Sequence, residues 1–254
     1  MLIDTHCHLD HPRFDNDRAD VIARARGAGL HHMITIGCDL KSSRRALDLA
    51  KTHTALYATV GIHPHDAQEA MPDHDEALKA LSAHPKCVAI GECGLDFYYD
   101  NSPRTEQEDV FRRQIRLAHD VALPLVIHVR DAWERFFAIL DEEGVPERGG
   151  VVHCFTGTQD NADESLKRGL HLSIPGVLTF KNPGDLPEVV KTMPADRFFV
   201  ETDSPFLAPI PHRGKRNEPS FVVAVAQKVA ELRDTTYDAV AAQTTANANA
   251  FFRL

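Results

Sequence analysis

The chain has 254 residues, of which 43% are hydrophobic and 26% are charged, and its net charge is -9 at pH 7. This composition is typical of a globular protein with a sizeable core. The acidic balance argues against a protein that holds polyanions on a broad basic surface, although it leaves nucleic-acid enzymes open.

Eight short apolar segments predict strands along the whole chain. Each is nearly continuous in apolar residues, which is typical of strands that are buried on both faces. The segments span residues 1–6, 31–37, 55–62, 87–92, 124–129, 150–155, 170–174 and 197–202.

Amphipathic segments between these strands predict helices, including helices over 17–29, 105–122, 218–233 and 235–252. Thr105 and Glu108 stand at the spacing of a capping box, which predicts a helix start at Thr105. Eight strand–helix alternations in one chain favour a (β/α)8 TIM barrel, an α/β fold, as a single domain over 1–254. A doubly wound open sheet is the alternative. A barrel would place functional residues at the C-terminal ends of its strands.

Two histidines end the first predicted strand, in the stretch DTHCHLD at 4–10. Residues two apart on a strand face the same side, so the imidazoles of His6 and His8 could reach one metal ion. Such a pair taken alone is more often structural or incidental, so the interpretation depends on the other strand ends.

Ligand-type residues also lie in or at the ends of five further predicted strands. Polar residues in apolar strands are costly to bury unless they are paired or metal-bound. Together with the first pair, they predict a metal site more readily than packing does. These residues are His63, Glu92, His128, His153, Glu201 and Asp203.

The residues at these strand ends suffice for two divalent metal ions. His6, His8 and Asp203 could hold the first ion, and His128 and His153 could hold the second. Glu92 has two carboxylate oxygens and could bridge the ions. Mixed imidazole and carboxylate ligands suit zinc or manganese, whereas four histidines weigh against a site that holds only magnesium.

A basic cluster in the segment 208–220 lies after the last predicted strand and includes His212, Arg213, Lys215 and Arg216. In a barrel this loop would hang beside the metals, where positive groups are well placed to hold phosphates. Arg130, just after the fifth predicted strand, is a weaker candidate for the same role.

Two aromatic residues extend this set of substrate-binding candidates. Phe155 and Phe206 could stack a nucleobase, although rim packing explains each of them equally well.

Cysteine usage and hydropathy bear on location. Five cysteines are too few for a disulfide framework, which indicates a reducing, cytoplasmic environment. Cys7, Cys93 and Cys154 each neighbour a proposed ligand, but adjacent strand residues point to opposite faces, so we interpret them as packing residues. No apolar run approaches the roughly 20 residues that cross a bilayer, and no signal peptide is recognisable, so we expect no membrane contact.

Six motifs, in this order, make the chain resemble the TatD family of metal-dependent deoxyribonucleases, within the amidohydrolase-like barrels. They are DTHCHLD, GIHPH, GECGLDFY, HVRDA, HCFTGT and VETDSPFLAP with the downstream HRGKRNEP. The resemblance implies a two-metal hydrolase that cleaves phosphodiester bonds of DNA, commonly as a 3′-5′ exonuclease. It implies as ligands His6, His8, Glu92, His128, His153 and Asp203. It also makes Glu201 a catalytic acidic residue and places His63 close to the site, where we expect His63 to bind substrate.

In the expected reaction, Glu201 or Asp203 accepts the proton of the attacking water. Three other functions remain open, namely a D-aminoacyl-tRNA deacylase, a small-molecule amidohydrolase or lactonase, and a metal-dependent scaffold without turnover. The basic loop favours a nucleic-acid partner, with DNA expected and tRNA the alternative. The sequence leaves the oligomeric state open.

Overall fold

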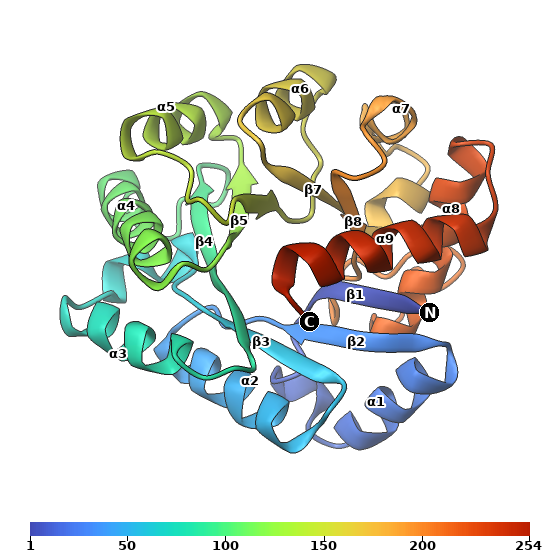
Figure 1. The fold of residues 1–254 in the computed structure, drawn as a ribbon, viewed down its shortest axis with the longest axis horizontal. Helices are drawn as coiled ribbons and strands as arrows, with labels where there is room; N and C mark the ends of the chain where they lie inside the picture. The colour runs from blue at the N-terminus through green and yellow to red at the C-terminus, as the bar shows by residue number, and fades with distance from the viewer. The chain divides into compact units, whose positions relative to one another are not determined.

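The computed structural model describes all residues from 1 to 254, and its strands alternate with helices along the chain (Figure 1). The strands are β1 (Leu2–Cys7), β2 (Leu30–Thr35), β3 (Leu56–Val60), β4 (Cys87–Asp96), β5 (Leu125–Arg130), β6 (Gly150–Val152), β7 (His171–Ile174) and β8 (Phe198–Val200). The α-helices are α1 (Arg18–Gly27), α2 (Leu40–Thr52), α3 (Asp73–Ser82), α4 (Arg104–Val121), α5 (Trp133–Glu143), α6 (Gln159–Lys167), α7 (Leu186–Thr192), α8 (Val222–Leu232) and α9 (Tyr237–Phe252). Short 3-10 helices are η1 (Pro12–Phe14), η2 (Pro64–Glu69), η3 (Gly176–Thr179) and η4 (Pro219–Phe221).

The strands form one eight-stranded sheet in the order β1 to β8, so that strands adjacent in the sequence are adjacent in the sheet. The pairs β1–β2, β3–β4, β4–β5, β5–β6 and β7–β8 are all parallel. A parallel bridge also joins Cys7, at the end of β1, to Ser204, just after β8. This is the strand arrangement of a (β/α)8 barrel, so the predicted fold is confirmed.

Internal packing divides the chain into two compact units, which are described separately below. The first unit comprises residues 1–35 and 154–254, and the second comprises residues 36–153. The single domain expected over 1–254 stays a prediction. None of the helices combines the length and the apolar character that a membrane span requires.

In the first unit, the last helix packs beside the first strand (Figure 1). Thr236 caps the start of α9 by accepting a hydrogen bond from the Ala239 N–H. Asn247 on the same helix donates to the carbonyl oxygens of Ala195 and Phe198 at 2.8 and 3.0 Å. These bonds satisfy backbone acceptors around the start of β8 and fix the end of the chain against the sheet.

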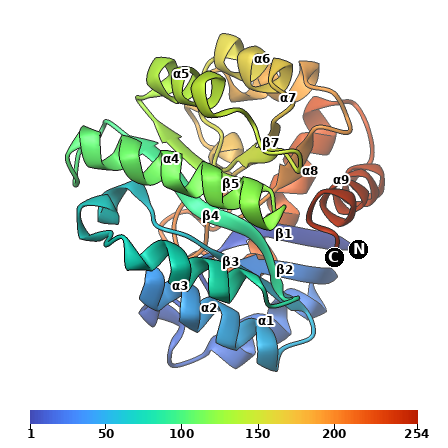
Figure 2. The ribbon, with the colours of Figure 1, turned by 60° about the vertical axis from the view of Figure 1, so that its left-hand side comes forward.

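In the second unit, α4 lies along β4 and beside α3 (Figure 2). Two buried glutamines on α4 each bind both backbone groups of one residue near a strand end. Gln107 accepts from the Asp96 N–H at 2.8 Å and donates to the Asp96 carbonyl at 3.1 Å. Gln114 makes the same pair of bonds to Ile62, both at 2.8 Å. Through these hydrogen bonds, helix α4 fixes the position of two backbone segments that carry candidate site residues.

One expected strand boundary is wrong, because β4 extends to Asp96 and Glu92 lies inside it instead of closing it. The pairing register with β5 shifts between Ile90 and Cys93, which marks a β-bulge. Gly91 has φ of 145°, and a Cβ there would lie 2.3 Å from the Val126 carbonyl oxygen, so only glycine fits. An uninterrupted apolar pattern does not reveal this bulge.

The expected capping box at the start of the helix at 105–122 is also wrong. Helix α4 begins one residue earlier, at Arg104, and its N-cap Pro103 makes no side-chain cap bond. Thr105 therefore lies inside the first turn, and Glu108 accepts a hydrogen bond from Arg135 at 2.6 Å. Glu108 therefore pairs with Arg135 of α5 instead of capping its own helix.

Candidate metal centre

Three predicted ligands of the first unit come together, and we call them the His6 group: His6, His8 and Asp203. The Nε2 atoms of His6 and His8 lie 3.3 Å apart. Asp203 Oδ1 lies 3.7 Å from Nε2 of His6 and 3.3 Å from Nε2 of His8. The fold therefore brings together side chains from opposite ends of the chain.

The backbone explains how this group forms. The Asp203 N–H donates to the His6 carbonyl at 2.9 Å, and the His8 N–H donates to the Ser204 carbonyl at 2.7 Å. The eighth strand was expected over 197–202 with Asp203 closing it, but β8 ends at Val200 and Asp203 lies in a turn with φ of 54°. This left-handed turn, together with the two backbone bonds, keeps its carboxylate beside both imidazoles.

Asp4 binds the backbone N–H of His6, and the sequence did not predict this role. Its carboxylate is fully buried and accepts from the Thr202 hydroxyl at 2.6 Å and from the Thr202 N–H at 2.9 Å. It also accepts from the His6 N–H at 3.3 Å. Burial raises the pKa of Asp4 well above its ordinary value, against the lowering effect of these hydrogen bonds.

Glu201 lies just after β8 and is fully buried. Its Oε1 accepts a hydrogen bond from the Cys154 N–H at 2.6 Å. Its own N–H donates to the Ile174 carbonyl at 3.1 Å. The carboxylate is therefore held by a backbone N–H from the segment that follows β6, while the backbone of Glu201 is bound to the last residue of β7.

Four histidine and glutamate side chains of the second unit form another cluster, which we call the Glu92 group: His63, Glu92, His128 and His153. Glu92 Oε1 lies 3.3 Å from Nε2 of His63 and 3.2 Å from Nδ1 of His128. The same oxygen lies 2.7 Å from Nε2 of His153. Nδ1 of His128 and Nε2 of His153 are 3.3 Å apart.

Backbone hydrogen bonds hold the residues of the Glu92 group in place. The Glu92 N–H donates to the Gly37 carbonyl at 2.9 Å, and the His63 N–H donates to the Cys38 carbonyl at 2.7 Å. The His153 N–H, just beyond β6, donates to the Ile127 carbonyl at 2.9 Å. His63 was expected close to the site, and its nitrogen is placed as a ligand atom would be.

The spacing of both groups fits a first-row metal ion. Four ligand atoms placed tetrahedrally at about 2.0–2.1 Å from zinc lie about 3.3–3.4 Å from one another. The separations in the two groups, from 2.7 to 3.7 Å, bracket this spacing. Each group also combines imidazole with carboxylate, as such ions prefer.

The pKa values of two histidines in the Glu92 group, His63 and His128, are shifted in opposite directions. Burial lowers the pKa of His63 to about 4, despite the neighbouring Glu92, so this imidazole is neutral at pH 7. Burial also disfavours the charged form of His128, but hydrogen bonds to Asp96 and Glu92 outweigh it and raise the pKa of His128. A neutral His63 has a lone pair available for a metal ion.

Three residues beside the Glu92 group were not predicted from the sequence. Asp96 Oδ2 lies 2.9 Å from Nε2 of His65 and 3.1 Å from Nε2 of His128. Cys38 Sγ lies 3.8 Å from Glu92 Oε2. His65 and Asp96 lie in the motifs GIHPH and GECGLDFY, but only the fold shows that they contact the candidate ligands.

An exposed surface of aromatic and cationic side chains continues from this site. Arg130, just where β5 ends, stacks over the rings of Tyr98 and Tyr99 at 4.1 and 4.8 Å. The two tyrosines are 57% and 54% exposed, and Tyr99 touches the ring of His65 edge-on at 5.5 Å. The predicted role of Arg130 thus gains two partners that the sequence did not indicate.

In the basic loop after β8, three cationic or imidazole side chains have partners within the protein. His212 stacks on Phe221 with ring centroids 3.7 Å apart, and Arg213 lies 3.9 Å over the ring of Phe180. Arg216 is engaged by Asp17 through two hydrogen bonds of 2.7 and 2.8 Å. Arg213 and Lys215 are exposed, so they remain the cations of this loop that are open to a ligand.

The structure contradicts one of the two aromatic predictions and agrees with the prediction for two of the cysteines. Phe155 is 1% exposed and packs in the core, so it cannot stack a base, whereas Phe206 is 43% exposed and touches His8 edge-on at 6.0 Å. Cys7 and Cys93 are fully buried, their thiols donate to backbone carbonyls, and burial raises the pKa of both. They are packing residues, as predicted.

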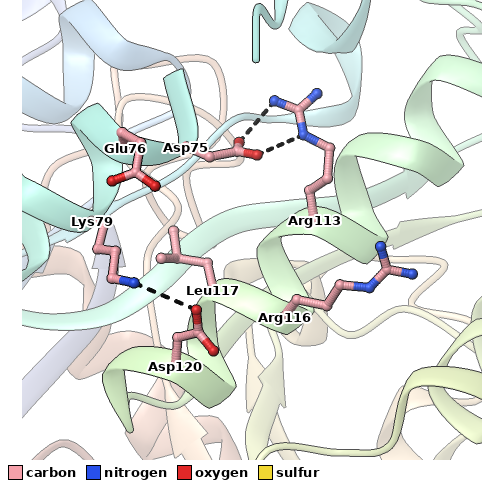
Figure 3. A pocket seen from close by; sticks show the side chains of 7 residues that line it. All are labelled: Asp75, Glu76, Lys79, Arg113, Arg116, Leu117 and Asp120. Carbon is pink, nitrogen blue, oxygen red and sulfur yellow. Dashed lines mark hydrogen bonds and ion pairs between the residues drawn. The ribbon is translucent and has the colours of Figure 1, made fainter. Parts of the chain in front are cut away.

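A shallow pocket between α3 and α4 lies apart from these residues (Figure 3). Arg113 forms a two-bond ion pair with Asp75, and Lys79 pairs with Asp120 at 3.5 Å. Its charges are largely satisfied within the protein, and none of the predicted site residues lines it. We assign no function to this pocket.

Comparison with known proteins places the fold and the site in a family. The model of the family described as TatD related DNase matches residues 3–253. The chain is 47% identical over 255 residues to the Bacillus subtilis protein named "Uncharacterized metal-dependent hydrolase YabD", covering 100% of both chains. It is 40% identical to the "3'-5' ssDNA/RNA exonuclease TatD" of Cronobacter sakazakii, covering 99% of this chain and 97% of that protein.

A solved structure agrees with these matches. The Escherichia coli TatD homologue YjjV superposes with a TM-score of 0.94 at 30% identity, covering 100% of this chain and 98% of that chain. The predicted resemblance and the predicted class of metal-dependent hydrolase are confirmed. The chain belongs to the TatD related DNase family.

Proposed function

We propose that this protein is a metal-dependent exonuclease that removes nucleotides from the 3′ end of single-stranded DNA or RNA. The single observation that carries the proposal is the pair of histidine–carboxylate groups with metal-like spacing, in a chain whose relatives include named 3′-5′ ssDNA/RNA exonucleases. Hydrolysis of a phosphodiester is a reaction for which such ligand sets are suited.

We assign one ion to the His6 group and a second ion to the Glu92 group, with zinc or manganese favoured over magnesium because of the many imidazoles. That Glu92 is shared between the ions, as its two carboxylate oxygens would allow, stays a prediction. A bound divalent cation supplies Lewis acidity toward a phosphoryl oxygen and makes water a stronger acid.

The protein's own acidic residues move the proton. Glu201 is the better candidate for accepting the proton of the attacking water, because its buried carboxylate is held by the Cys154 N–H. Asp203 serves as a ligand beside His6 and His8. Because water is the attacking group and Glu201 takes its proton, the reaction needs no covalent nucleophile from the protein.

Substrate is held by cations and exposed rings. Arg213 and Lys215 are proposed to contact backbone phosphates, with His212 beside them. Arg130 and the tyrosine pair that it covers offer a cation and stacking faces for an unpaired strand. Stacking of this kind is worth about 1–3 kcal/mol per base.

The direct test compares oligonucleotides labelled at the 5′ or the 3′ end. Metal-free protein is reconstituted with zinc, manganese or magnesium and given single-stranded DNA, RNA and duplex DNA. A 3′-5′ exonuclease releases the 3′ label at once and shortens the 5′-labelled strand in single-nucleotide steps. Release of D-amino acids from D-aminoacyl-tRNA, or opening of lactones, with no cleavage of either oligonucleotide would overturn the proposal.

Variants separate the two acidic roles. Glu201→Gln keeps the shape and can still accept from the Cys154 N–H, so metal content should stay normal while kcat falls about 100-fold or more. Asp203→Ala removes a ligand, so the purified variant should contain less metal than the wild type. Excess metal should restore part of its rate. Glu188→Gln, which makes the same charge change on an exposed face of α7, is the matched control. Rescue of Glu201→Gln by excess metal would make Glu201 a ligand and refute this assignment.

A further inference from the structure

Asp96 is a fully buried carboxylate in which each oxygen has its own partners. Oδ1 accepts from the N–H groups of Tyr98 and Tyr99 at 3.1 and 2.9 Å. Oδ2 faces Nε2 of His65 at 2.9 Å and Nε2 of His128 at 3.1 Å. We propose that Asp96 is a positioning residue that holds His128 in the tautomer whose Nδ1 lone pair faces the Glu92 group. This inference rests on the proposed metal-dependent function.

The direction of the His128 bond follows from chemistry. Two backbone N–H groups and two imidazoles surround a carboxylate, and an ionised carboxylate can only accept. The Oδ1 and Oδ2 atoms of Asp96 each lie within hydrogen-bond distance of two of these groups. His128 therefore donates to Asp96 through Nε2–H, and Nδ1 is the nitrogen that is left to face the Glu92 group.

The geometry on the other side of the ring agrees with this assignment. Nδ1 of His128 lies 3.2 Å from Glu92 Oε1 and 3.3 Å from Nε2 of His153. The nitrogen opposite Asp96 is thus the one that points toward the candidate ligands. A carboxylate on the outer nitrogen of a metal-binding histidine fixes both its tautomer and its ring orientation.

Asp96 is itself rigidly held, which a positioning residue requires. Its N–H and carbonyl are both bound by the side chain of Gln107, at 2.8 and 3.1 Å. Gln107 also donates to the Ser102 carbonyl at 2.8 Å, so it connects the end of β4 to the loop before α4. The carboxylate cannot turn away from His128 without breaking the two amide bonds to Oδ1.

His65 completes the arrangement from η2. Its ring lies edge-on to the ring of His63, with centroids 4.4 Å apart, and edge-on to Tyr99 at 5.5 Å. Its bond to Oδ2 places a second N–H donor on the oxygen that serves His128. His65 thus keeps Oδ2 directed at the imidazole pair.

The substitution Asp96→Asn tests this with almost no change of shape. The N–H groups of Tyr98 and Tyr99 require an acceptor, so the amide oxygen must occupy the Oδ1 position and the NH₂ the Oδ2 position. A donor then faces Nε2 of His128, which must become the acceptor, and the ring proton moves to Nδ1. The variant should bind zinc about 10- to 100-fold more weakly at the Glu92 group, the usual effect of losing such a partner.

Asp100→Asn is the matched control, because it removes one negative charge from the segment that directly follows β4. Asp100 is exposed and pairs with Arg104 at 2.8 and 2.9 Å, away from His128. Zinc affinity is measured by competition with a chromophoric chelator, and cobalt absorption reports the geometry of the bound ion. The control should match the wild type in both.

A structural readout is independent of catalysis. In the zinc-loaded wild type, long-range 1H–15N correlation of the histidine rings, assigned with His128→Gln, should show a proton on Nε2 of His128 and none on Nδ1. A proton on Nδ1 of His128 in the zinc-loaded wild type, or equal zinc affinity in the wild type and Asp96→Asn, overturns the role of Asp96. Failure of the wild type to bind any divalent cation would instead overturn the proposed function.

Discussion

The hydrogen bonds of Gln114 allow a quantitative prediction for Gln114→Met. The glutamine is 1% exposed and satisfies both the N–H and the carbonyl of Ile62, which is 3% exposed. Methionine has similar length but offers neither bond, so two buried backbone groups would lose their partner. Each such group costs about 1–3 kcal/mol, so the free energy of unfolding should fall by about 2–6 kcal/mol.

Thermal unfolding of metal-free protein measures this loss. At about 2–4 °C per kcal/mol for a chain of this size, a loss of about 4 kcal/mol lowers Tm by roughly 8–16 °C. The control is Gln159→Met, which removes only two exposed bonds, one to Asp163 and one from the Thr192 hydroxyl, and should stay within about 0.5 kcal/mol. Because Ile62 precedes His63, zinc affinity at 20 °C should also weaken. A fall in stability below about 1 kcal/mol would refute the reasoning, since it would mean that Ile62 finds other partners.

Three further predictions concern metal, substrate and pH. Glu92→Ala should lower zinc content at both ligand groups, and elemental analysis showing full occupancy would contradict its shared role. Arg213→Ala combined with Lys215→Ala should raise KM for single-stranded DNA and flatten its salt dependence at unchanged metal content; an unchanged KM at every salt concentration would exclude the loop as a phosphate site. Burial lowers the pKa of His171 to about 4, so its contribution to stability is full above pH 6.5 and is lost as the pH falls toward 4. Between pH 7 and 5 the wild type should therefore lose about 2 kcal/mol more than His171→Phe, and equal Tm shifts would show that His171 does not titrate in this way.

The fold could be predicted from the sequence because its signal is local and repeated. All eight expected strands are present, since each is a short apolar run between amphipathic helices. The ends of the strands were less predictable. The bulge at Gly91 and the left-handed turn at Asp203 depend on contacts with neighbouring strands that no local pattern encodes.

The candidate ligands were predictable because histidines and carboxylates are unusual at buried strand ends. Their supports were not, because Asp4 and Asp96 act through hydrogen bonds to residues distant in the sequence. Phe155 shows the opposite error, in which a plausible stacking residue is buried in the core. Motif order indicates which residues meet, but not which atoms face one another.

The two ligand groups differ in when they become complete during synthesis. The Glu92 group lies wholly within residues 36–153, whereas the His6 group needs Asp203 as well as the first strand. A ribosome that adds about 5–20 residues per second reaches Asp203 roughly 3–10 s after His153. The nascent chain therefore carries one finished set of ligands while the other still lacks its carboxylate. On the proposed assignment of one ion to each group, the ligands of the Glu92 group are thus all synthesised before the His6 group is complete.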